Sequence, residues 1–556
     1  MNEQNIALLL DIFGYVSVLL RGLVLVTQSL TVGGIVFLAL AARPLRRELG
    51  PVGDAGLQRC RRLLLVSALA FVAAQLGFVL LQAVVLMGTV GIGLGNALGA
   101  DFARYGLVAA AAALVAALVA AGPLDGKRFL PLPVLALVML LAQLGMSHAA
   151  ARLDDRAALA AADFLHMAGA AAWIGGIPYF LLALGRAEDG IAYRRIGRRF
   201  SQVAMGAVAV LLIGGVTMAI VYVGSLDALY GTAYGVMVAT KVMLLGGLLL
   251  LAALNFSLVE RLRRDPSTPI IRLKRFAEVE IGLGLTVFFA AASLTSQPPA
   301  VDLTTDRASA QEVIERIVPR WPRFDSPDHA SLALSELQAR LDAEARTANT
   351  PRALAYVPGE GQLAPRNAED IAWSEYNHHW SGLFVLAIGV LALLERSGFA
   401  PWARHWPLLF LGLAAFLFIR SDPEVWPLGD IGFFASLRDP EVVQHRVFVA
   451  LIAAFGLFEW RVRVGRLARS RARLVFPLIT ATGGALLLTH SHALANVKEQ
   501  LLIEITHVPL ALAGVTAGWA RWLELRLDGP GSRIAAWIWP VAFVVVGLVL
   551  LAYREA

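Results

Sequence analysis

The sequence predicts an all-α protein of the polytopic membrane class, a bundle of about fourteen transmembrane helices. Of its 556 residues, 58% are apolar or aromatic and 16% are charged, whereas a soluble chain carries roughly 25% charged residues. Apolar runs of about 20 residues, the length that crosses a bilayer, recur along the whole chain. Short arginine clusters separate these runs. The expected partner of the surface is therefore the lipid bilayer, and no nucleic acid is expected.

A polar gap divides the predicted spans into a group of eight and a group of six. The first group lies near 14–40, 63–87, 104–121, 130–148, 159–185, 203–223, 235–258 and 276–296. The second lies near 378–396, 402–420, 443–460, 473–490, 500–520 and 534–553. The gap at 297–371 includes an amphipathic stretch at about 329–346, which predicts short helices on the outer surface. We expect a membrane domain over 1–298, a periplasmic loop over 299–371 and a C-terminal membrane domain over 372–556.

The arginine clusters predict the orientation of the chain. Every loop that follows an odd-numbered span is basic, as the positive-inside rule requires of cytoplasmic loops. An even number of spans then places both termini in the periplasm. The first apolar run is long enough to remain in the membrane, so no cleavable signal peptide is expected. Cys60, the single cysteine, lies between Arg59 and Arg61 and is expected in a cytoplasmic loop, and one cysteine excludes an intrachain disulfide.

Histidines gather at one side of the predicted bundle. The chain has ten; His329 falls in the polar gap and His405 follows a cytoplasmic loop. The other eight fall at the outer ends of spans: His148, His166, His378, His379, His445, His490, His492 and His507. Two predicted hairpins each hold a pair, 18 and 17 residues apart, and equal helix rise places the members of a pair at similar depth. This pattern favours metal binding, because ionisable groups below a membrane surface are costly and usually functional.

Carboxylates and thioethers accompany these histidines. Asp163, Glu375 and Glu504 each lie three residues before a histidine, on the same helical face. A carboxylate there can orient the imidazole or share its metal ion. Met146 and Met167 flank the first hairpin, and thioether with imidazole suits Cu(I). We expect one site from Met146, His148, His166 and Met167, and a second from His378, His445, His490 and His507, with His379 and His492 as further candidate ligands.

Simpler structural interpretations stand beside these. A single histidine at a helix end, such as His379 or His492, is commonly an interfacial polar residue, and the two methionines can equally be packing residues. Lys241 and Glu280 lie close enough to span ends to extend toward the interface, or they serve the site. The pair Gly214-Gly215 and the run Trp173 to Gly176 indicate close helix packing. No phosphate-binding glycine loop is present, so ATP-driven pumping is unsupported.

Several segments resemble the CopD/PcoD copper-resistance family of bacterial inner-membrane proteins. The segments are Phe164-Leu165-His166-Met167-Ala168-Gly169 through Gly175-Gly176, Arg199-Phe200-Ser201, Gly224-Ser225-Leu226 through Tyr234-Gly235 with Lys241, and Glu280 ahead of Leu294 through Ala300. The part from Asn377-His378-His379-Trp380 to about 525 resembles the C-terminal extension of longer members. The resemblance implies copper uptake across the inner membrane, with copper delivered by a separate periplasmic CopC-like carrier, since no segment looks like a fused β-sandwich.

The leading hypothesis is a copper-binding transporter rather than an enzyme, with copper ions as the bound species and no catalytic residues assigned. Asp163, Glu375, Glu504 and Lys241 would support the ligands. One alternative is a redox protein that ligates haem b through paired histidines. Another is a di-iron or other di-metal carboxylate enzyme, since Glu-x-x-His on two helices is typical of such sites. A further possibility combines metal binding with oxidation of Cu(I) in the C-terminal part.

Overall fold

The computed structural model is helical throughout the part of the chain that it describes. It describes residues 3–147, 149, 152, 155–187, 189–304, 307–328, 368–423, 425–429, 431–437, 440–467, 470–489 and 497–555. Apart from one isolated bridge between Val425 and Ile431, no β-structure occurs among these residues. Thirteen of the described helices are long and apolar enough to cross a membrane. The predicted all-α, polytopic fold is confirmed.

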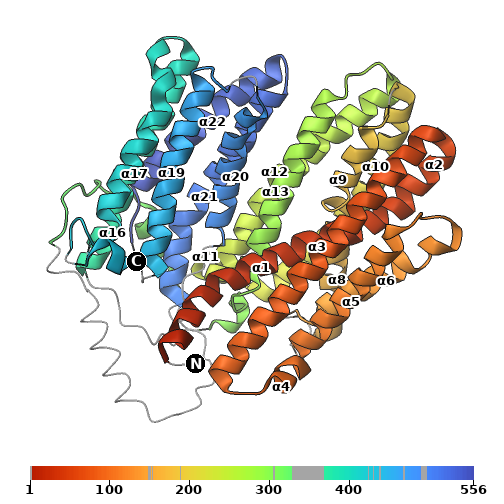
Figure 1. Cartoon of the computed structure of the whole chain (residues 1–556), viewed down its shortest axis with the longest axis horizontal. Coiled ribbons are helices and arrows are strands. Elements are labelled where there is room, and N and C mark those ends of the chain that lie inside the picture. Colours follow the sequence, from red (N-terminus) through yellow and green to blue (C-terminus); the bar gives the residue numbers. More distant parts are fainter. Residues whose placement is uncertain are drawn as a thin grey trace. The chain divides into compact units, whose positions relative to one another are not determined.

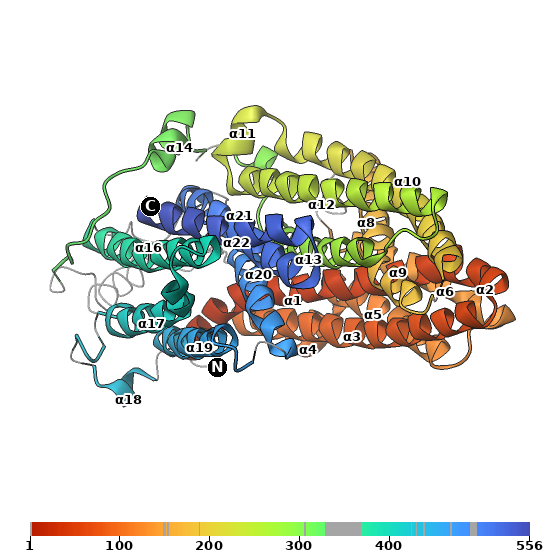
Figure 2. The same ribbon diagram turned by 90° about the horizontal axis from the view of Figure 1, so that it is seen from above.

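Contacts divide the chain into two compact units. Unit 1 contains 1–229, 237–302 and 489–493, and unit 2 contains 230–236, 303–488 and 494–556. Figures 1 and 2 show each unit as a bundle of long helices. The two units are described separately below.

Unit 1 is built around the first helix and its neighbours. Its main helices are α1 (Glu3–Phe37), α2 (Arg43–Leu49), α3 (Pro51–Val90), α5 (Asp101–Ala121), α6 (Pro131–Leu144), α8 (Arg156–Trp173), α9 (Ile177–Leu184), α10 (Gly190–Val223), α12 (Ala233–Arg264) and α13 (Ile271–Leu294). The most extensive packing joins α8 to α10, α1 to α3 and α3 to α5. Helix α5 is alanine-rich, and its buried alanines allow close approach to its neighbours while favouring the helix itself.

The predicted loop position of Cys60 is wrong. Helix α3 runs without a break from Pro51 to Val90, so the arginines around Cys60 are helical rather than part of a loop. Cys60 is fully buried, and its thiol lies 3.5 Å from the backbone oxygen of Tyr179. The helix extends well beyond its apolar run because Pro51 occupies its first turn, where a missing N–H costs nothing.

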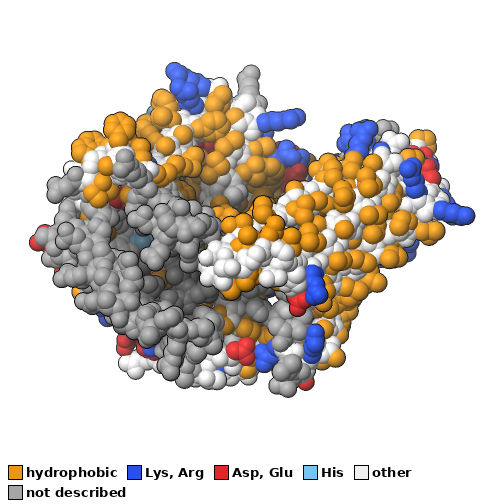
Figure 3. Space-filling view, turned by 60° about the horizontal axis from the view of Figure 1, so that its bottom comes forward, with side chains coloured by type: hydrophobic (Ala, Val, Ile, Leu, Met, Phe, Trp, Pro, Cys, Tyr) orange, Lys and Arg blue, Asp and Glu red, His pale blue; other side chains and the backbone are white. Residues whose placement is uncertain are grey.

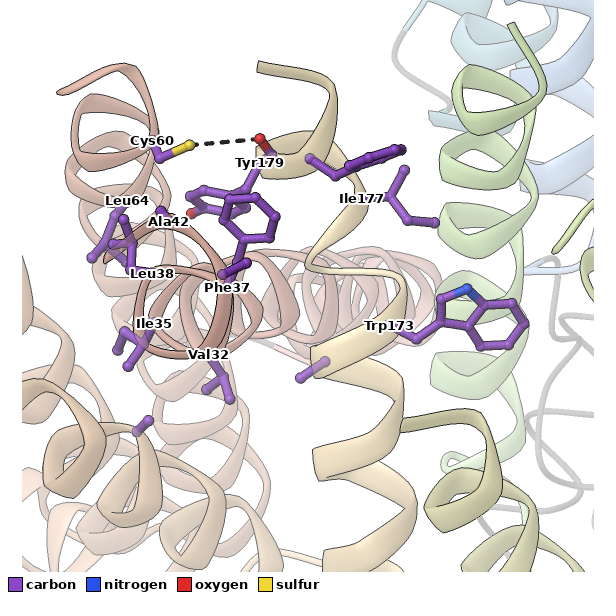
Figure 4. Close-up of a cluster of buried hydrophobic side chains, with 14 of the residues drawn as sticks. Val32, Ile35, Phe37, Leu38, Ala42, Cys60, Leu64, Trp173, Ile177 and Tyr179 are labelled. Carbon is purple, nitrogen blue, oxygen red and sulfur yellow. Dashed lines mark hydrogen bonds between the residues drawn. The ribbon is translucent and has the colours of Figure 1, made fainter. Parts of the chain in front are cut away.

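The core of unit 1 lies where α1 crosses the break between α8 and α9. Phe37, Leu38 and Tyr179 are fully buried there with Trp173, as Figure 4 shows. A side chain at Gly175 would collide with the backbone of α1 at Ser29. The predicted span 159–185 is therefore two helices, joined by a turn whose glycine lets α1 approach the backbone directly.

The arginine-rich helix ends of unit 1 meet at one end, which we call the basic end. Arg195 donates to the backbone oxygen of Glu48 over 2.9 Å, and Arg199 donates to that of Leu40 over 2.8 Å. Helix α12 ends at the same place, because Gly190 at the start of α10 lies against Pro266 of the loop after α12. These contacts bring together clusters that the sequence separates by more than 140 residues.

Unit 2 is a second bundle with an aromatic core. Its helices are α14 (Ala310–Ile317), α16 (Ala368–Ser397), η5 (Pro401–Leu408), α17 (Leu409–Arg420), α18 (Phe433–Ser436), α19 (Pro440–Arg463), η6 (Arg471–Leu474), α20 (Val475–Leu487), α21 (Val497–Arg526) and α22 (Pro530–Leu551). The twelfth predicted span, 473–490, corresponds to η6 with the short helix α20. Trp406, Phe476 and Trp539 form the centre of the core.

One end of unit 2 holds a buried ionic network, which we call the arginine–glutamate network. Arg463 of α19 bonds Glu395 of α16 over 3.0 Å and Glu459 over 2.9 Å. Arg521 of α21 bonds Glu524 over 2.5 Å. The indole N–H groups of Trp406 and Trp539 donate to Glu395 and Glu524 respectively. Each glutamate thus has an arginine partner, as the burial of a charge requires.

The flanks of the helices carry apolar side chains. Leu80, Ile220 and Leu250 are each more than 60% exposed although they are strongly apolar. On the face drawn in Figure 3, hydrophobic side chains cover the helices and Lys and Arg side chains lie at their ends. This distribution is that of a protein whose surface contacts lipid.

Candidate functional site

His166 occupies a prepared place between α8 and α10. Its Nδ1 lies 3.1 Å from the backbone oxygen of Leu211. The predicted glycine pair makes the space: a Cβ at Gly215 would lie 2.9 Å from His166 Nδ1, and one at Gly214 would lie 2.8 Å from the His166 backbone nitrogen. The glycines that predicted close helix packing therefore also set the position of this imidazole.

Asp163 interacts electrostatically with two cations, whereas the Nδ1 atom of His166 is bonded to the backbone oxygen of Leu211. The charge of Asp163 acts on Lys241 of α12 and on Arg21 of α1, two cations held inside the bundle. The Arg21 guanidinium also lies 2.7 and 2.9 Å from the side-chain oxygen of Gln143, once that amide is turned to face it. Arg21 was not among the predicted site residues, although an arginine inside the first apolar run is a signal of function.

The methionines of the predicted first site lie in different settings. Met167 packs against the main apolar cluster of unit 1. Met146 is half-buried in the turn after α6, where its N–H donates to the backbone oxygen of Gln143. His148 lies outside the described residues.

Unit 2 brings His378 and His507 together. Their ring centres, on α16 and α21, lie 6.3 Å apart with the planes at 87°. The phenol ring of Tyr553 stacks on His378 at 3.8 Å and meets His507 edge-on at 5.7 Å. Two imidazoles that share one metal ion have ring centres roughly 6 Å apart, given metal–nitrogen bonds of about 2 Å. The spacing of this pair therefore fits a common ion.

The chain after α22 holds Tyr553 over the histidine pair. The Tyr553 hydroxyl donates to Glu555 Oε2 over 2.9 Å, and Ser374 of α16 donates to the same oxygen. Arg316 donates to the Glu555 backbone oxygen. Tyr553 ends the last predicted span and Glu555 follows it, and both lie outside any histidine motif, so the sequence pattern did not predict them.

His379 and Glu375 interact with groups outside the histidine pair. His379 is 4% exposed; its Nδ1 accepts from the Arg323 N–H over 2.7 Å, and its Nε2 donates to the Tyr553 backbone oxygen over 2.9 Å. Both ring nitrogens are thus used by the backbone. Glu375 acts electrostatically on Arg316. We therefore leave both residues out of the site proposed below.

The remaining predicted residues of unit 2 are placed as follows. His445 of α19 bonds Asp422, which is 8% exposed, through Nδ1 at 2.7 Å. Glu504 is buried in α21, one turn before His507. His490 and His492 lie outside the described residues. No cluster of three or more His, Cys, Asp or Glu side chains able to hold a metal ion occurs among the residues that the structure describes.

Four histidines share one protonation pattern. Nδ1 of His166, His378 and His507 lies against a backbone oxygen, from Leu211, Ser374 and Ile503 respectively, and Nδ1 of His445 lies against a carboxylate. Such oxygens only accept, so Nδ1 carries the proton and Nε2 of the neutral ring keeps its lone pair. This is the usual state of a metal-ligating histidine. His405 is the opposite case, because its Nδ1 accepts from the Trp460 indole.

These features define a class: a multi-pass membrane protein with partly buried imidazoles whose Nδ1 atoms are bonded to oxygen. Residues 194–294, which form α10, α12 and α13, match the family model described as copper resistance protein D, CopD. Over this region the chain is similar to the CopD family, in agreement with the resemblance seen in the sequence. The matched segment carries Lys241 and Glu280.

A curated relative agrees with the family. The chain is 32% identical over 164 residues to a protein of Bacillus subtilis (strain 168) named copper transport protein CutJ. The aligned part covers 29% of this chain and 29% of that relative. No solved structure matches the chain significantly.

Proposed function

We propose that the protein binds copper ions below the outer surface of a bacterial inner membrane and transports them inward. His378 and His507 form the principal site, with Tyr553 stacked against them. His166 forms a second site with Met146 and His148. The match of residues 194–294 to the CopD family model and the name of the Bacillus relative, copper transport protein, support copper as the cargo.

One observation carries the proposal: His378 and His507 lie at the spacing of a shared ion, each with Nδ1 against its own helix. A helix carbonyl one turn earlier holds each ring in the ligating tautomer before any ion arrives. Soft, low-coordinate Cu(I) suits two imidazoles. His445, His490 and His492 complete the candidate ligand set, and a periplasmic CopC-like carrier is the proposed donor of copper.

Elemental analysis of the purified protein tests this function. Wild type should retain copper after exposure to Cu(I) and desalting, and the double variant H378A/H507A should lose the copper of the principal site. H405A is the matched control, because His405 is bonded by Trp460 and lies outside the proposed sites. Equal copper in wild type and the double variant would remove the proposed site, and no copper in any of the three would remove the function.

The histidine pair also fits a second candidate, a haem. Two imidazoles on neighbouring helices are a common ligand set for b-type haem iron, and the 6.3 Å spacing allows it. A visible spectrum of the same preparations separates the two. A Soret band that H378A/H507A loses would assign the pair to haem, whereas copper without such a band would assign it to copper.

A further inference from the structure

Unit 1 contains a cavity that the histidine sites do not explain. Its volume is about 540 Å³, and its walls come from α8, α9, α10, α12 and α13. Most of the lining is apolar, with Phe180, Phe200 and Leu249 among its residues. Met205 and Phe256, which are 51% and 45% exposed, line its mouth at the surface of the unit.

Glu280 of α13 is the ionisable side chain in this lining. It is 4% exposed, and the other described lining residues carry no titratable group. Asn255 of α12 donates to Glu280 Oε1 over 2.5 Å, and the Trp173 indole of α8 also hydrogen-bonds to the carboxyl group. In Figure 4 the Trp173 ring points away from the centre of the apolar cluster. Both partners of Glu280 are neutral.

The charged side chains of α13 and α1 considered next are paired with another residue or lie away from Glu280. On α13, Glu278 pairs with Arg275. On α1, Arg21 is followed by Gly22, which lies against Phe289, nine residues further along α13 than Glu280 and hence about 14 Å away along the axis. The lining residues from α8, α9, α10 and α12 are neutral. A buried carboxylate without a facing cation is costly, and such a group usually takes up a proton instead.

The position of Glu280 is suited to exchange with the basic end. It lies nine residues after Ile271, where α13 begins, and Asn255 lies nine residues before Arg264, where α12 ends. Each is thus about 14 Å from the basic end along its helix. The hydroxyl groups of Ser201 and Ser257 also line the cavity. Together these side chains are the polar part of an otherwise apolar lining.

We propose that Glu280 is a proton-binding site of unit 1, loaded through this cavity from the basic end. The carboxylate gains one proton to become the neutral acid and loses the same proton on release. Asn255 and Trp173 position it through hydrogen bonds in either state. Proton binding stands on the cavity and its neutral surroundings, while coupling to copper movement rests additionally on the proposed function.

A hydrophobic carbodiimide tests the proton site, because such reagents modify protonated carboxyl groups within membrane proteins. Purified protein in lipid discs would be treated at a series of pH values and the adducts mapped by peptide mass spectrometry. We expect an adduct on Glu280 that diminishes as the pH rises and is lost in E280Q. Glu459 is the matched control: it is 1% exposed but pairs with the Arg463 guanidinium, which favours its charged form, so its adduct should be weaker than that of Glu280 at each pH.

An infrared difference spectrum between low and high pH gives a second readout that needs no reagent access. The carbonyl band of protonated carboxyl groups should contain a component in wild type that is missing in E280Q. Absence of both this component and the adduct, or an adduct that does not change with pH, would overturn the proposal. If both are found but copper uptake into vesicles depends on pH equally in wild type and E280Q, the proton site stands and its coupling is rejected.

Discussion

Histidine orientation in this protein depends on oxygen atoms that lie outside the histidine motifs. His166 uses a carbonyl from α10, and His445 uses Asp422, which precedes its helix. His378 and His507 use carbonyls of their own helices. In each case the proton is fixed on Nδ1, which leaves Nε2 as the ligating atom. His379 differs from these residues because the backbone bonds both of its ring nitrogens, so neither nitrogen is left to bind a metal ion.

The space at Gly215 predicts the effect of one added methyl group. In G215A the new Cβ would press on the His166 ring at 2.9 Å, so the ring must turn away from Leu211. We expect a loss of about 1–3 kcal/mol in the free energy of unfolding and weaker copper binding at His166. Thermal unfolding and copper titration in H378A/H507A, where the other site is removed, measure both.

Gly206 supplies the control on the same helix. Nothing lies within 4 Å of a Cβ built there, so G206A should gain up to about 1 kcal/mol from helix propensity. Equal copper affinity in G215A and G206A would show that the glycine pair does not position His166.

The site could be predicted only in part. Histidines at the outer span ends were visible because the residue is rare and costly in a membrane. The partners were not visible: Arg21 contacts Gln143 more than 120 residues away, and Glu555 reaches Ser374 across 181 positions. An i, i+3 spacing places Asp163 on the same helical face as His166. The sequence does not show that the charge of Asp163 acts on Arg21 of α1 and Lys241 of α12, because these helices are far away along the chain.

At the scale of helices, apolar length predicts the spans, while small residues decide how they pack. The apolar runs gave the helices of both units because a bilayer span needs its backbone hydrogen bonds within one segment. Interruptions were harder to foresee. The break between α8 and α9, and the arginine-bearing extension of α3, arise from contacts with α1 and from the proline at the start of a helix.

Helix α20 offers adjacent glycines with different neighbours. A Cβ at Gly484 would lie 2.7 Å from the Val515 nitrogen and 2.8 Å from the Ala511 oxygen, both backbone atoms of α21. Backbone cannot move aside, so G484A should separate the two helices and cost about 1–3 kcal/mol in unfolding free energy. At Gly483 nothing lies within 4 Å. In unfolding experiments in detergent, G483A should be at least as stable as wild type. If G483A lost as much unfolding free energy as G484A, the predicted role of Gly484 in packing α20 against α21 would be wrong.

Helix α14 is attached to α21 by a pH-sensitive contact. Lys498 and the Ser309 cap lower the pKa of Glu312 to about 2 from its usual 4.5, and the Lys498–Glu312 distance is 2.6 Å. Because the folded pKa is lowered, this contribution is complete above about pH 4.5 and is lost as the pH falls toward 2. Amide exchange of α14 should therefore increase over that window. Salt should weaken the contact, since both side chains are more than a third exposed.

The matched variant for this contact is K498M. It removes the Lys498 bond, the largest cause of the lowered pKa of Glu312, and leaves the Ser309 cap. Amide exchange of α14 should therefore increase at a higher pH than in wild type. Identical exchange profiles in the two proteins would show that the ion pair does not hold the helix.

At the scale of the whole molecule, the basic end of unit 1 predicts the orientation in the membrane. Cys60 is fully buried, so introduced cysteines can be labelled against a silent background. Leu226 is 79% exposed, and the Arg264 side chain is also 79% exposed. An impermeant maleimide should label L226C in intact spheroplasts and R264C only after lysis. The reverse result would invert the predicted topology, with both termini then cytoplasmic.

The arginine–glutamate network has a consequence for how the chain is made. Its charges arrive on α16, α19 and α21, which a ribosome completes one after another. A lone charged residue raises the cost of entering lipid by up to about 3 kcal/mol. Glu395 therefore lacks its bonded partner until Arg463 has been synthesised. We expect the insertion machinery to retain α16 beside the channel until α19 emerges, so that Glu395 and Arg463 enter the bilayer as a pair.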